Sequence, residues 1–332
     1  MEGTYLDPVT HAIIGLSVSK LAVNSISLSN PATLGIVAGS LIPDIDIVMQ
    51  KWGDYAYLKN HRGATHSVVG IIISSLAVAL ILGGIFKLAS IPLLFMWTML
   101  GNISHVFFDI FNCYGSKLLW PFIKRKFSFA ALMSFDPLLV SILAGCAFLR
   151  GNVGKICFVV LFLYMVMRIL LQMSLKRKLV KTYGEVAERI NIFPSVSGIF
   201  KWLFVIEKKD ENIVGVRNFL RKKEKELVTL PKIDKDIAKR ALESPLGRFF
   251  KDFSPVFHIE YERRGGINTY KFIDLRYYMK KNFLHHAILV VDDNNRILTS
   301  SFNPYSINRR NILTSRDLKH YTGAYVLRNE NA

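Results

Sequence analysis

The stretch from residue 61 to residue 109 decides the fold: HRGATHSVVG IIISSLAVAL ILGGIFKLAS IPLLFMWTML GNISHVFFD. No charged residue occurs between Val68 and Phe86, and a bilayer-spanning helix needs about 20 apolar residues. A second apolar run, residues 90–108, follows a tight break. Two spanning helices joined by a short turn form a hairpin. The polar residues that open the first span and close the second are therefore predicted to meet at one mouth.

Four polar side chains stand at that mouth. His61 and His66 precede the first span, and His105 and Asp109 end the second. Because His105 and Asp109 are four residues apart on a predicted helix, they share one face and can chelate one cation. His61 and His66 are five apart, which is poor for one helical face, and Gly63 between them predicts a turn with His66 opening the helix. Ionisable residues at membrane depth are costly and usually functional, so the topology predicts a metal site.

A pair of carboxylates, Asp44 and Asp46, follows Pro43 at the end of an earlier helical stretch. In an extended segment both side chains point the same way. Carboxylates with imidazoles suit Zn²⁺, Mn²⁺ or Fe²⁺ rather than Ca²⁺. Each piece has a plainer explanation, since a histidine near a helix end is often structural and Asp44 can be a turn former. The joint pattern favours metal, because four of the eight histidines lie in the first 110 residues, each beside a predicted helix end.

The rest of the first half predicts further helices, giving a polytopic α-helical membrane domain of about six helices. The predicted helices are residues 9–28, 32–42, 68–86, 90–108, 127–149 and 156–173, with a polar and aromatic loop at 47–60. Small residues in 32–42 permit close helix packing in a membrane. Asp136-Pro137 interrupts the fifth helix, and Asp136 is either a helix cap or a further ligand. Arg168 near the end of the sixth is expected to snorkel toward water.

Charge divides the chain into two domains, predicted as residues 1–182 and 183–332. Residues 1–175 hold 12 Lys and Arg against 7 Asp and Glu, whereas residues 176–332 hold 31 against 18. The second domain is predicted as a small, basic, cytoplasmic α+β domain. Its predicted strands are 201–207, 212–217, 256–261, 269–274, 286–291 and 297–301, with a charged helix at 219–227. Its surface suits anionic lipid, a nucleic acid or a protein partner, or simply follows the charge bias of cytoplasmic domains.

Orientation follows from the distribution of positive charge. With six helices and the N-terminus inside, the inner loops carry eleven Lys and Arg and the outer loops three. Positive residues concentrate in cytoplasmic loops. The sequence therefore predicts a multi-pass protein of the cell membrane with both termini, and the polar mouth, in the cytoplasm. Three cysteines without a CxxC pair predict neither a disulfide framework nor a thiolate metal site.

Four blocks resemble a known family. Thr10-His11, Pro43-Asp44-Ile45-Asp46, residues 61–67 and His105-x-x-x-Asp109 match, in order and spacing, the YdjM-like inner-membrane metal-dependent hydrolases. The whole chain most resembles the YfhP-type bacterial members. The resemblance implies distant kinship with zinc-dependent phospholipase C and related nucleases, which are all-helical enzymes with clustered zinc ions. It implies seven metal ligands: His11, Asp44, Asp46, His61, His66, His105 and Asp109.

The leading hypothesis is a metal-dependent hydrolase of a phosphoester, lipid being one candidate, at the cytoplasmic face. Asp46 or Asp109 would bridge two metals or act as base, and Arg62 would hold a phosphate oxygen. A second hypothesis is a membrane regulator or interaction protein with a structural metal site. A third is a metal transporter, which polar residues gathered at one face argue against. The histidines of the second domain, His258, His285, His286 and His320, are expected to be structural.

Overall fold

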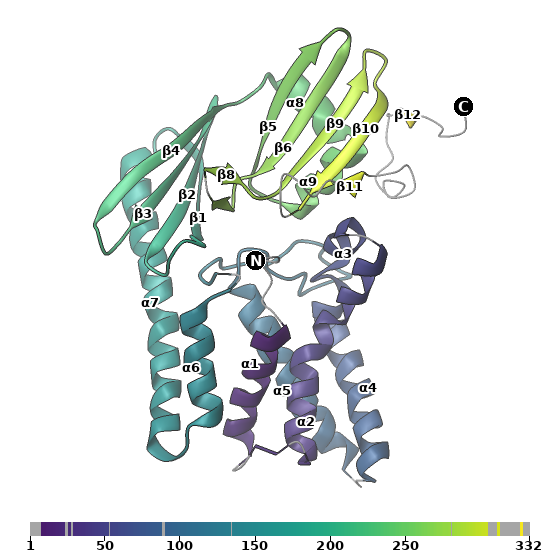
Figure 1. The fold of residues 1–332 in the computed structure, drawn as a ribbon, viewed down its shortest axis with the longest axis vertical. Coiled ribbons are helices and arrows are strands. Elements are labelled where there is room, and N and C mark those ends of the chain that lie inside the picture. The colour runs from purple at the N-terminus through teal and green to yellow at the C-terminus, as the bar shows by residue number, and fades with distance from the viewer. Residues whose placement is uncertain are drawn as a thin grey trace. The chain divides into compact units, whose positions relative to one another are not determined.

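The protein divides into two compact units in a computed structural model (Figure 1). The structure describes residues 8–304, 311–312 and 326–327, apart from positions 24–25, 28, 53, 88–89, 134 and 280. The helical unit comprises Thr4–Val48 and Asn60–Met173. The α+β unit comprises Ser174–Ala332 together with Met49–Lys59, a short segment that lies far earlier in the chain.

Apolar helices build the helical unit. The helices of the first half are α1 (Pro8–Ala22), α2 (Pro31–Leu41), α3 (Asp54–Asn60), α4 (Val68–Phe86), α5 (Ile91–Ile110), α6 (Pro137–Phe148) and α7 (Gly151–Tyr183). Four helical segments in the described chain are long and apolar enough to cross a membrane: 31–52, 68–86, 91–110 and 151–183. α1 ends at Ala22, earlier than the predicted end at residue 28, and positions 24–25 and 28 lie outside the described residues. The predicted hairpin of spans is confirmed as α4 and α5.

Glycine allows the helices that carry the polar residues to pack closely. A Cβ atom at Gly39 of α2 would strike the carbonyl oxygen of Thr98 in α5. A Cβ atom at Gly101 of α5 would strike the carbonyl oxygen of Ile36 in return. The two backbones therefore approach at contact distance, as the small residues of 32–42 predicted. This contact sets α2 and α5 side by side, so that polar residues at the end of each can meet.

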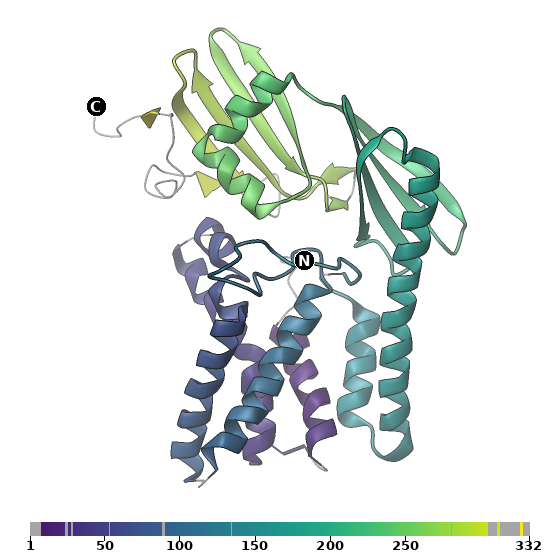
Figure 2. The ribbon, with the colours of Figure 1, turned by 180° about the vertical axis from the view of Figure 1, so that it is seen from behind.

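The fifth predicted helix is shorter than expected, because α6 begins only at Pro137. Asp136 caps it, accepting a hydrogen bond from the Leu139 N–H at 3.2 Å, which is the helix-cap alternative. α6 and α7 lie side by side (Figures 1 and 2). The snorkelling expected of Arg168 in α7 is wrong. Arg168 is fully buried, and its Nε donates to the Ala131 carbonyl at 2.8 Å, so a backbone acceptor satisfies it inside the protein.

The segment between α2 and α4 is helical rather than a loop. A 3-10 helix, η1 (Ile42–Trp52), continues α2, and α3 follows it. A second 3-10 turn, η2 (Ala64–His66), precedes Ser67, which caps α4. The extended conformation expected at Asp44 and Asp46 is therefore wrong. In a helix with three residues per turn, side chains two apart diverge, and these two carboxylates serve different neighbours.

The described residues of the α+β unit form a four-stranded sheet, a six-stranded sheet and a two-stranded pair. Its elements are β1 (Ala187–Pro194), β2 (Lys201–Lys208), β3 (Glu211–Asn218), β4 (Lys223–Pro231), α8 (Lys235–Glu243), α9 (Pro245–Phe253), β5 (Phe257–Arg264), β6 (Ile267–Asp274), β7 (Tyr278–Met279), β8 (Asn282–Phe283), β9 (His286–Asp292), β10 (Arg296–Asn303), β11 (Asn311–Ile312) and β12 (Val326–Leu327). The first sheet has the order β1-β2-β3-β4, and the second β11-β10-β9-β6-β5. β12 adds a parallel partner to β10, and β7 pairs with β8. α8 and α9 cover one face of the second sheet (Figure 2).

One element of this unit differs in kind from its prediction. The charged helix expected at 219–227 is wrong, because the chain turns and then forms β4. In a strand, charged side chains pair with opposite charges on the neighbouring strand. Glu224 of β4 contacts Arg217 of β3 in this way, at 3.6 Å. The α+β class and the six predicted strands are confirmed, whereas β1, α8 and α9 were not predicted.

Candidate metal centre

The polar residues singled out in the sequence gather at one end of the helical unit. There α1 and α4 begin and α2 and α5 end (Figure 1). They are His11, Asp44, Asp46, His61, Arg62, His66, His105 and Asp109. His66, His105 and Asp109 have no exposed surface, and the Asp44 side chain is 15% exposed. The structure thus joins residues almost a hundred positions apart in one buried cluster.

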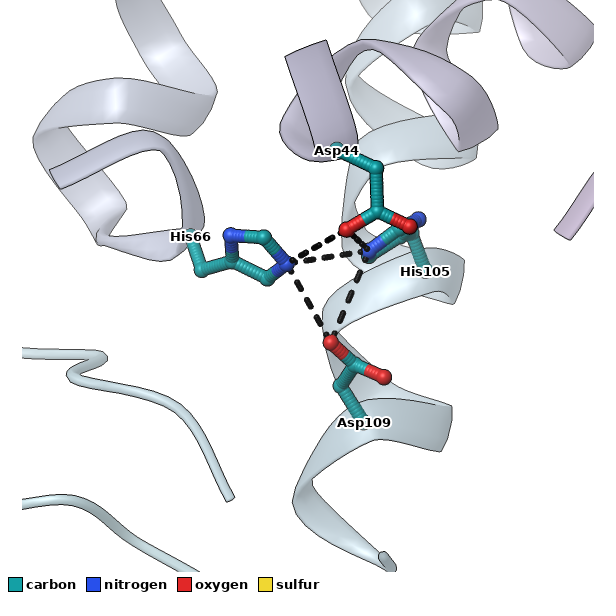
Figure 3. Close-up of side chains that lie close together, drawn as sticks. All are labelled: Asp44, His66, His105 and Asp109. Atoms are coloured by element: carbon teal, nitrogen blue, oxygen red, sulfur yellow. Dashed lines mark hydrogen bonds and ion pairs between the residues drawn. The ribbon is translucent and has the colours of Figure 1, made fainter. Parts of the chain in front are cut away.

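Four of these residues form the first ligand group: Asp44, His66, His105 and Asp109 (Figure 3). The two Nε2 atoms of His66 and His105 are 3.1 Å apart. His66 Nε2 lies 3.3 Å from Asp44 Oδ1 and 3.2 Å from Asp109 Oδ2. His105 Nε2 lies 3.5 Å and 3.6 Å from the same two oxygens. The side chains therefore point at a common centre.

The spacing of these atoms fits a tetrahedral cation. Ligands about 2.0–2.1 Å from a zinc ion at tetrahedral angles lie roughly 3.4 Å from one another. The five distances run from 3.1 to 3.6 Å around that value. Asp44 Oδ1 and Asp109 Oδ2 are buried without a hydrogen bond, whereas Asp109 Oδ1 is paired with Arg62 Nη2 at 2.9 Å. Buried carboxylates that make no hydrogen bond are expensive, and a bound cation would compensate them.

Neighbouring groups orient both imidazoles toward that centre. His105 donates from Nδ1 to the Ser40 carbonyl at 2.7 Å, which leaves a lone pair on Nε2. The Thr65 hydroxyl donates to Asp46 at 3.4 Å, so it accepts from Nδ1 of His66 at 3.0 Å. With both rings neutral, two lone pairs face two carboxylates, an arrangement that a bound cation would satisfy. Neither Ser40 nor Thr65 was predicted as part of the site. Ser40 acts through its backbone carbonyl, and Thr65 acts by orienting the ring of His66.

A second ligand group shares Asp44 with the first and adds Asp46 and His61. His61 Nδ1 donates to Asp46 at 3.0 Å, leaving Nε2 as the lone pair. Burial lowers the pKa of His61, although the hydrogen bond to Asp46 opposes the shift. His61 is therefore neutral at physiological pH, the form in which histidine binds metals. Because Asp44 belongs to both groups, its carboxylate is placed to serve two ions.

His11 lies beside the two groups without belonging to either. Its ring stacks on that of His105 with the centroids 3.6 Å apart. Nε2 of His11 lies 3.7 Å from Asp109 Oδ1 and 3.9 Å from Asp44 Oδ2, the carboxylate oxygens turned away from the first group. Both ring nitrogens are buried and make no hydrogen bond. The His11 imidazole is therefore adjacent to the predicted ligands but farther from them than they are from one another.

Arg62 faces Asp109 rather than open solvent. Its Nη2 atom is 2.9 Å from Asp109 Oδ1, and its guanidinium lies over the Tyr114 ring at 5.5 Å. The backbone of Arg62 has a φ of 61°, and its N–H donates to Asp46 at 3.3 Å. The carbonyl of Arg62 accepts from the Lys117 N–H at 3.0 Å. Arg62 therefore contacts both Asp46 and Asp109, the two carboxylates that the sequence analysis proposed as a base or a bridging ligand.

The other candidate residues lie outside the centre. Asp136 caps α6 and accepts from the Tyr164 hydroxyl. In the α+β unit, His258 contacts Asn212, His286 contacts Asn303, and His285 packs edge-on against Phe253 and Tyr277. His320 lies outside the described residues. The three described histidines of that unit thus have packing or hydrogen-bonding partners.

Comparison with known proteins identifies the family. The family model described as YdjM inner membrane protein matches residues 6–178, which include every residue of the centre. The chain belongs to the YdjM inner membrane protein family. A second model, the YfhP C-terminal alpha/beta plait domain, matches residues 236–311 of this YdjM-family chain. The chain is 30% identical over 302 residues to the uncharacterized protein YfhP of Bacillus subtilis (strain 168), covering 86% of this chain and 90% of that one.

No solved structure matches this YdjM-family chain. The family description and the apolar helices together make it a multi-pass membrane protein in contact with lipid. The predicted family is thereby confirmed, and so is the predicted combination of a helical membrane part with an α+β part.

Proposed function

We propose that this YdjM-family protein is a membrane-embedded, metal-dependent hydrolase of a phosphoester, with a lipid phosphoester as its candidate substrate. The observation that carries the proposal is the first ligand group, in which four acceptor atoms converge at tetrahedral spacing. Nitrogen and carboxylate donors favour zinc, with manganese or iron as alternatives. A metal held there would supply Lewis acidity, which polarises a phosphoryl oxygen and lowers the pKa of bound water to about 7.

The ligands divide between the two groups. Asp44, His66, His105 and Asp109 would hold one ion, and Asp44, Asp46 and His61 would hold a second, with Asp44 common to both groups. Sites with two ions about 3.5–4 Å apart are common among phosphoester hydrolases. His11, next to the outer oxygens of Asp44 and Asp109, is assigned as a further ligand of the second ion.

Asp46 is the residue we assign to proton transfer. Its carboxylate accepts from His61 Nδ1, the Arg62 N–H and the Thr65 hydroxyl. These contacts hold the Asp46 carboxylate beside the centre, where it would take up the proton released from a water molecule. Asp109 is assigned as a bridging or terminal ligand whose charge Arg62 balances.

Arg62 is assigned to substrate binding. A guanidinium offers five N–H donors in one plane and binds phosphoryl oxygens through several of them at once. Arg62, with Nη2 2.9 Å from Asp109, would present those donors at the metal centre. Burial of Arg62 to 3% exposure would strengthen that contact, because charge interactions gain in a low-dielectric site. The bias of eleven Lys and Arg against three supports a cytoplasmic location for this centre.

The test measures hydrolysis by purified protein in detergent with added zinc or manganese, using soluble and lipid phosphoesters. Asp109→Asn keeps the shape but removes a negative charge from the ligand set, so both metal content and hydrolysis should fall at least tenfold. Asp252→Asn, an exposed change in α9, is the matched control and should alter neither.

If metal-loaded wild-type protein cleaves no phosphoester, and deletion of residues 183–332 alone removes the cellular phenotype, the protein is a regulator that uses its basic α+β part to bind a protein or nucleic acid. The metal would then be a structural ion.

A further inference from the structure

The segment Met49–Lys59 belongs to the α+β unit, although site residues of the helical unit flank it. Asp44 and Asp46 stand before it on η1, and His61 and Arg62 stand directly after α3. Only two residues separate Asp46 from the segment, and one residue separates His61 from it. The chain therefore leaves the metal centre, enters the α+β unit and returns to the metal centre within 15 residues.

Aromatic packing holds this segment in the α+β unit. Tyr55 of α3 is 5% exposed, and its ring centroid lies 4.6 Å from that of Phe249 in α9. Phe249 is 1% exposed and also contacts Phe253 at 6.1 Å and Phe302 at 5.1 Å. Tyr55 thus extends the aromatic core that α9 forms with β10. Lys59, at the end of α3, places its Nζ 5.8 Å from the Tyr55 ring.

The two ligand groups differ in their dependence on this segment. His66 is the last residue of η2, and His105 and Asp109 sit on α5, all within the helical unit. Asp46 and His61 are each within three residues of the anchored segment, and a residue spans at most about 3.6 Å. A shift of α3 therefore moves Asp46 and His61 directly, whereas the histidines of the first group move only if the helices move.

We propose that the α+β unit positions the ligand group of Asp44, Asp46 and His61 through the contact of Tyr55 with Phe249, and that Tyr55 is a positioning residue for metal binding. The proposal rests on the metal site of the proposed function and adds a route by which the second domain controls it. Loss of the aromatic contact lets α3 shift, so Asp46 and His61 lose their geometry while His66, His105 and Asp109 of the first group keep theirs. Any partner that displaces α9 from Tyr55 would regulate the site in the same way.

The test uses the full-length protein with zinc alone as the probe. Tyr55→Ala should weaken zinc binding at the second group about 3- to 10-fold, the range expected for losing one aromatic pair. Tyr55→Phe keeps the ring and should restore it. Tyr261→Ala removes a different aromatic pair of the α+β unit, that of Tyr261 with Tyr270, and should leave zinc binding unchanged.

Double variants assign the effect to one group. In a His61→Ala background, which lacks the second group, adding Tyr55→Ala should cause no further loss of zinc. In a His66→Ala background the full effect of Tyr55→Ala should remain. A loss of equal size in both backgrounds would overturn the proposal, because it would mean that the whole protein, rather than one ligand group, is disturbed.

Hydrogen exchange in metal-free protein gives a readout that does not depend on zinc. Residues 42–62 should exchange faster in Tyr55→Ala than in wild type or Tyr261→Ala, while residues 91–110 stay unchanged. Tyr55→Leu, which keeps the apolar volume, takes its place if Tyr55→Ala does not fold. Unchanged exchange overturns the proposal. If wild-type protein binds no zinc, the proposed function fails. Hydrogen exchange then still decides whether the contact of Tyr55 with Phe249 holds residues 42–62 in place.

Discussion

At the scale of single residues, the orientation of two imidazoles decides the interpretation of the centre. Ser40 and Thr65 each engage an Nδ1 atom, so in the neutral rings the Nε2 atoms of His66 and His105 face each other at 3.1 Å as acceptors. Two acceptors at that distance repel unless a cation or a proton lies between them. With two carboxylates around the same point, a divalent ion balances the charge better than a single proton.

Removing those ligands should remove the metal. His66→Ala or His105→Ala should lower the divalent metal retained by purified protein by at least half, because each takes one donor from a four-atom group. A variant with His61, His66 and His105 all changed to alanine should retain none. Elemental analysis after dialysis measures both. Metal content equal to wild type in the triple variant would rule out the centre.

The buried histidines of the α+β unit predict a pH dependence separate from the metal. Burial lowers the pKa of both His258 and His285 to about 4, from an ordinary value of 6.5. Between pH 6.5 and 4 the unfolded chain binds more protons than the folded chain, so stability falls as the pH falls. Each histidine contributes at most about 1.4 kcal/mol per pH unit in that window and nothing above it.

Hydrogen exchange of the α+β unit at pH 5 and pH 7, corrected for the intrinsic rate, measures this loss. His285→Phe removes one titrating group and fits among the Phe253 and Tyr277 rings, so it should reduce the difference. An α+β unit equally stable at both pH values would contradict the prediction.

At the scale of helices and strands, composition and spacing predicted most of the elements but missed how they end. Runs without charge identified α4 and α5, and the small residues of 32–42 predicted close helix packing, which α2 makes with α5. Arg168 was misjudged because its partner is the backbone of Ala131, 37 positions away, and no local pattern reveals it. Asp44 and Asp46 were misjudged because η1 extends α2 beyond Pro43, where proline favours a helix end.

The α+β unit shows the same limit. Short strand-like runs beside turn residues predicted the strands β2, β3, β6 and β9, each of which holds several buried residues. The charged stretch of β4 was misread as a helix because its side chains are mostly exposed and only its cross-strand partners distinguish the two structures. In the metal centre, the ligands were predictable from residue type, whereas the orienting contacts of Ser40 and Thr65 depended on the fold.

The cap of α6 provides a prediction that separates structural from ligating carboxylates. Asp136→Ala should lower the stability of the helical unit by about 1 kcal/mol for the lost cap, and further because Tyr164 loses its acceptor. Asp136→Asn should keep most of the cap. Thermal unfolding in detergent measures the stability, and metal content should be unchanged in both variants. Loss of metal without loss of stability would make Asp136 a ligand.

At the scale of the whole molecule, the two ends of the bundle differ in charge and in chemistry. The ligand residues occupy the end where α4 begins, and Lys87 caps the other end of α4. A helix of 19 residues is about 28 Å long, the thickness of a hydrocarbon core, so these two ends should face opposite sides of the membrane. The excess of Lys and Arg at the ligand end predicts that it is cytoplasmic.

Cysteine labelling tests this orientation in intact cells. The native cysteines, Cys113, Cys146 and Cys157, are first replaced by alanine. An impermeant thiol reagent added from outside should then label Lys87→Cys and Arg150→Cys, which are exposed positions at the end of α4 and just before α7. It should label Asn60→Cys and Lys124→Cys only after the cells are opened, because Asn60 adjoins His61 and Lys124 lies in a loop that is hydrogen bonded to Arg62 through Lys117.

The labelling result also decides which substrates can reach the centre. Labelling of Asn60→Cys from outside, with none at Lys87→Cys, would invert the topology and turn the ligand groups toward the outer surface. A cytoplasmic centre instead draws on substrates of the cytoplasmic leaflet or the cytosol, where anionic lipids and basic residues attract each other. Since residues 176–332 carry an excess of thirteen positive charges, the same orientation would bring that basic region to the leaflet with the more negative surface potential.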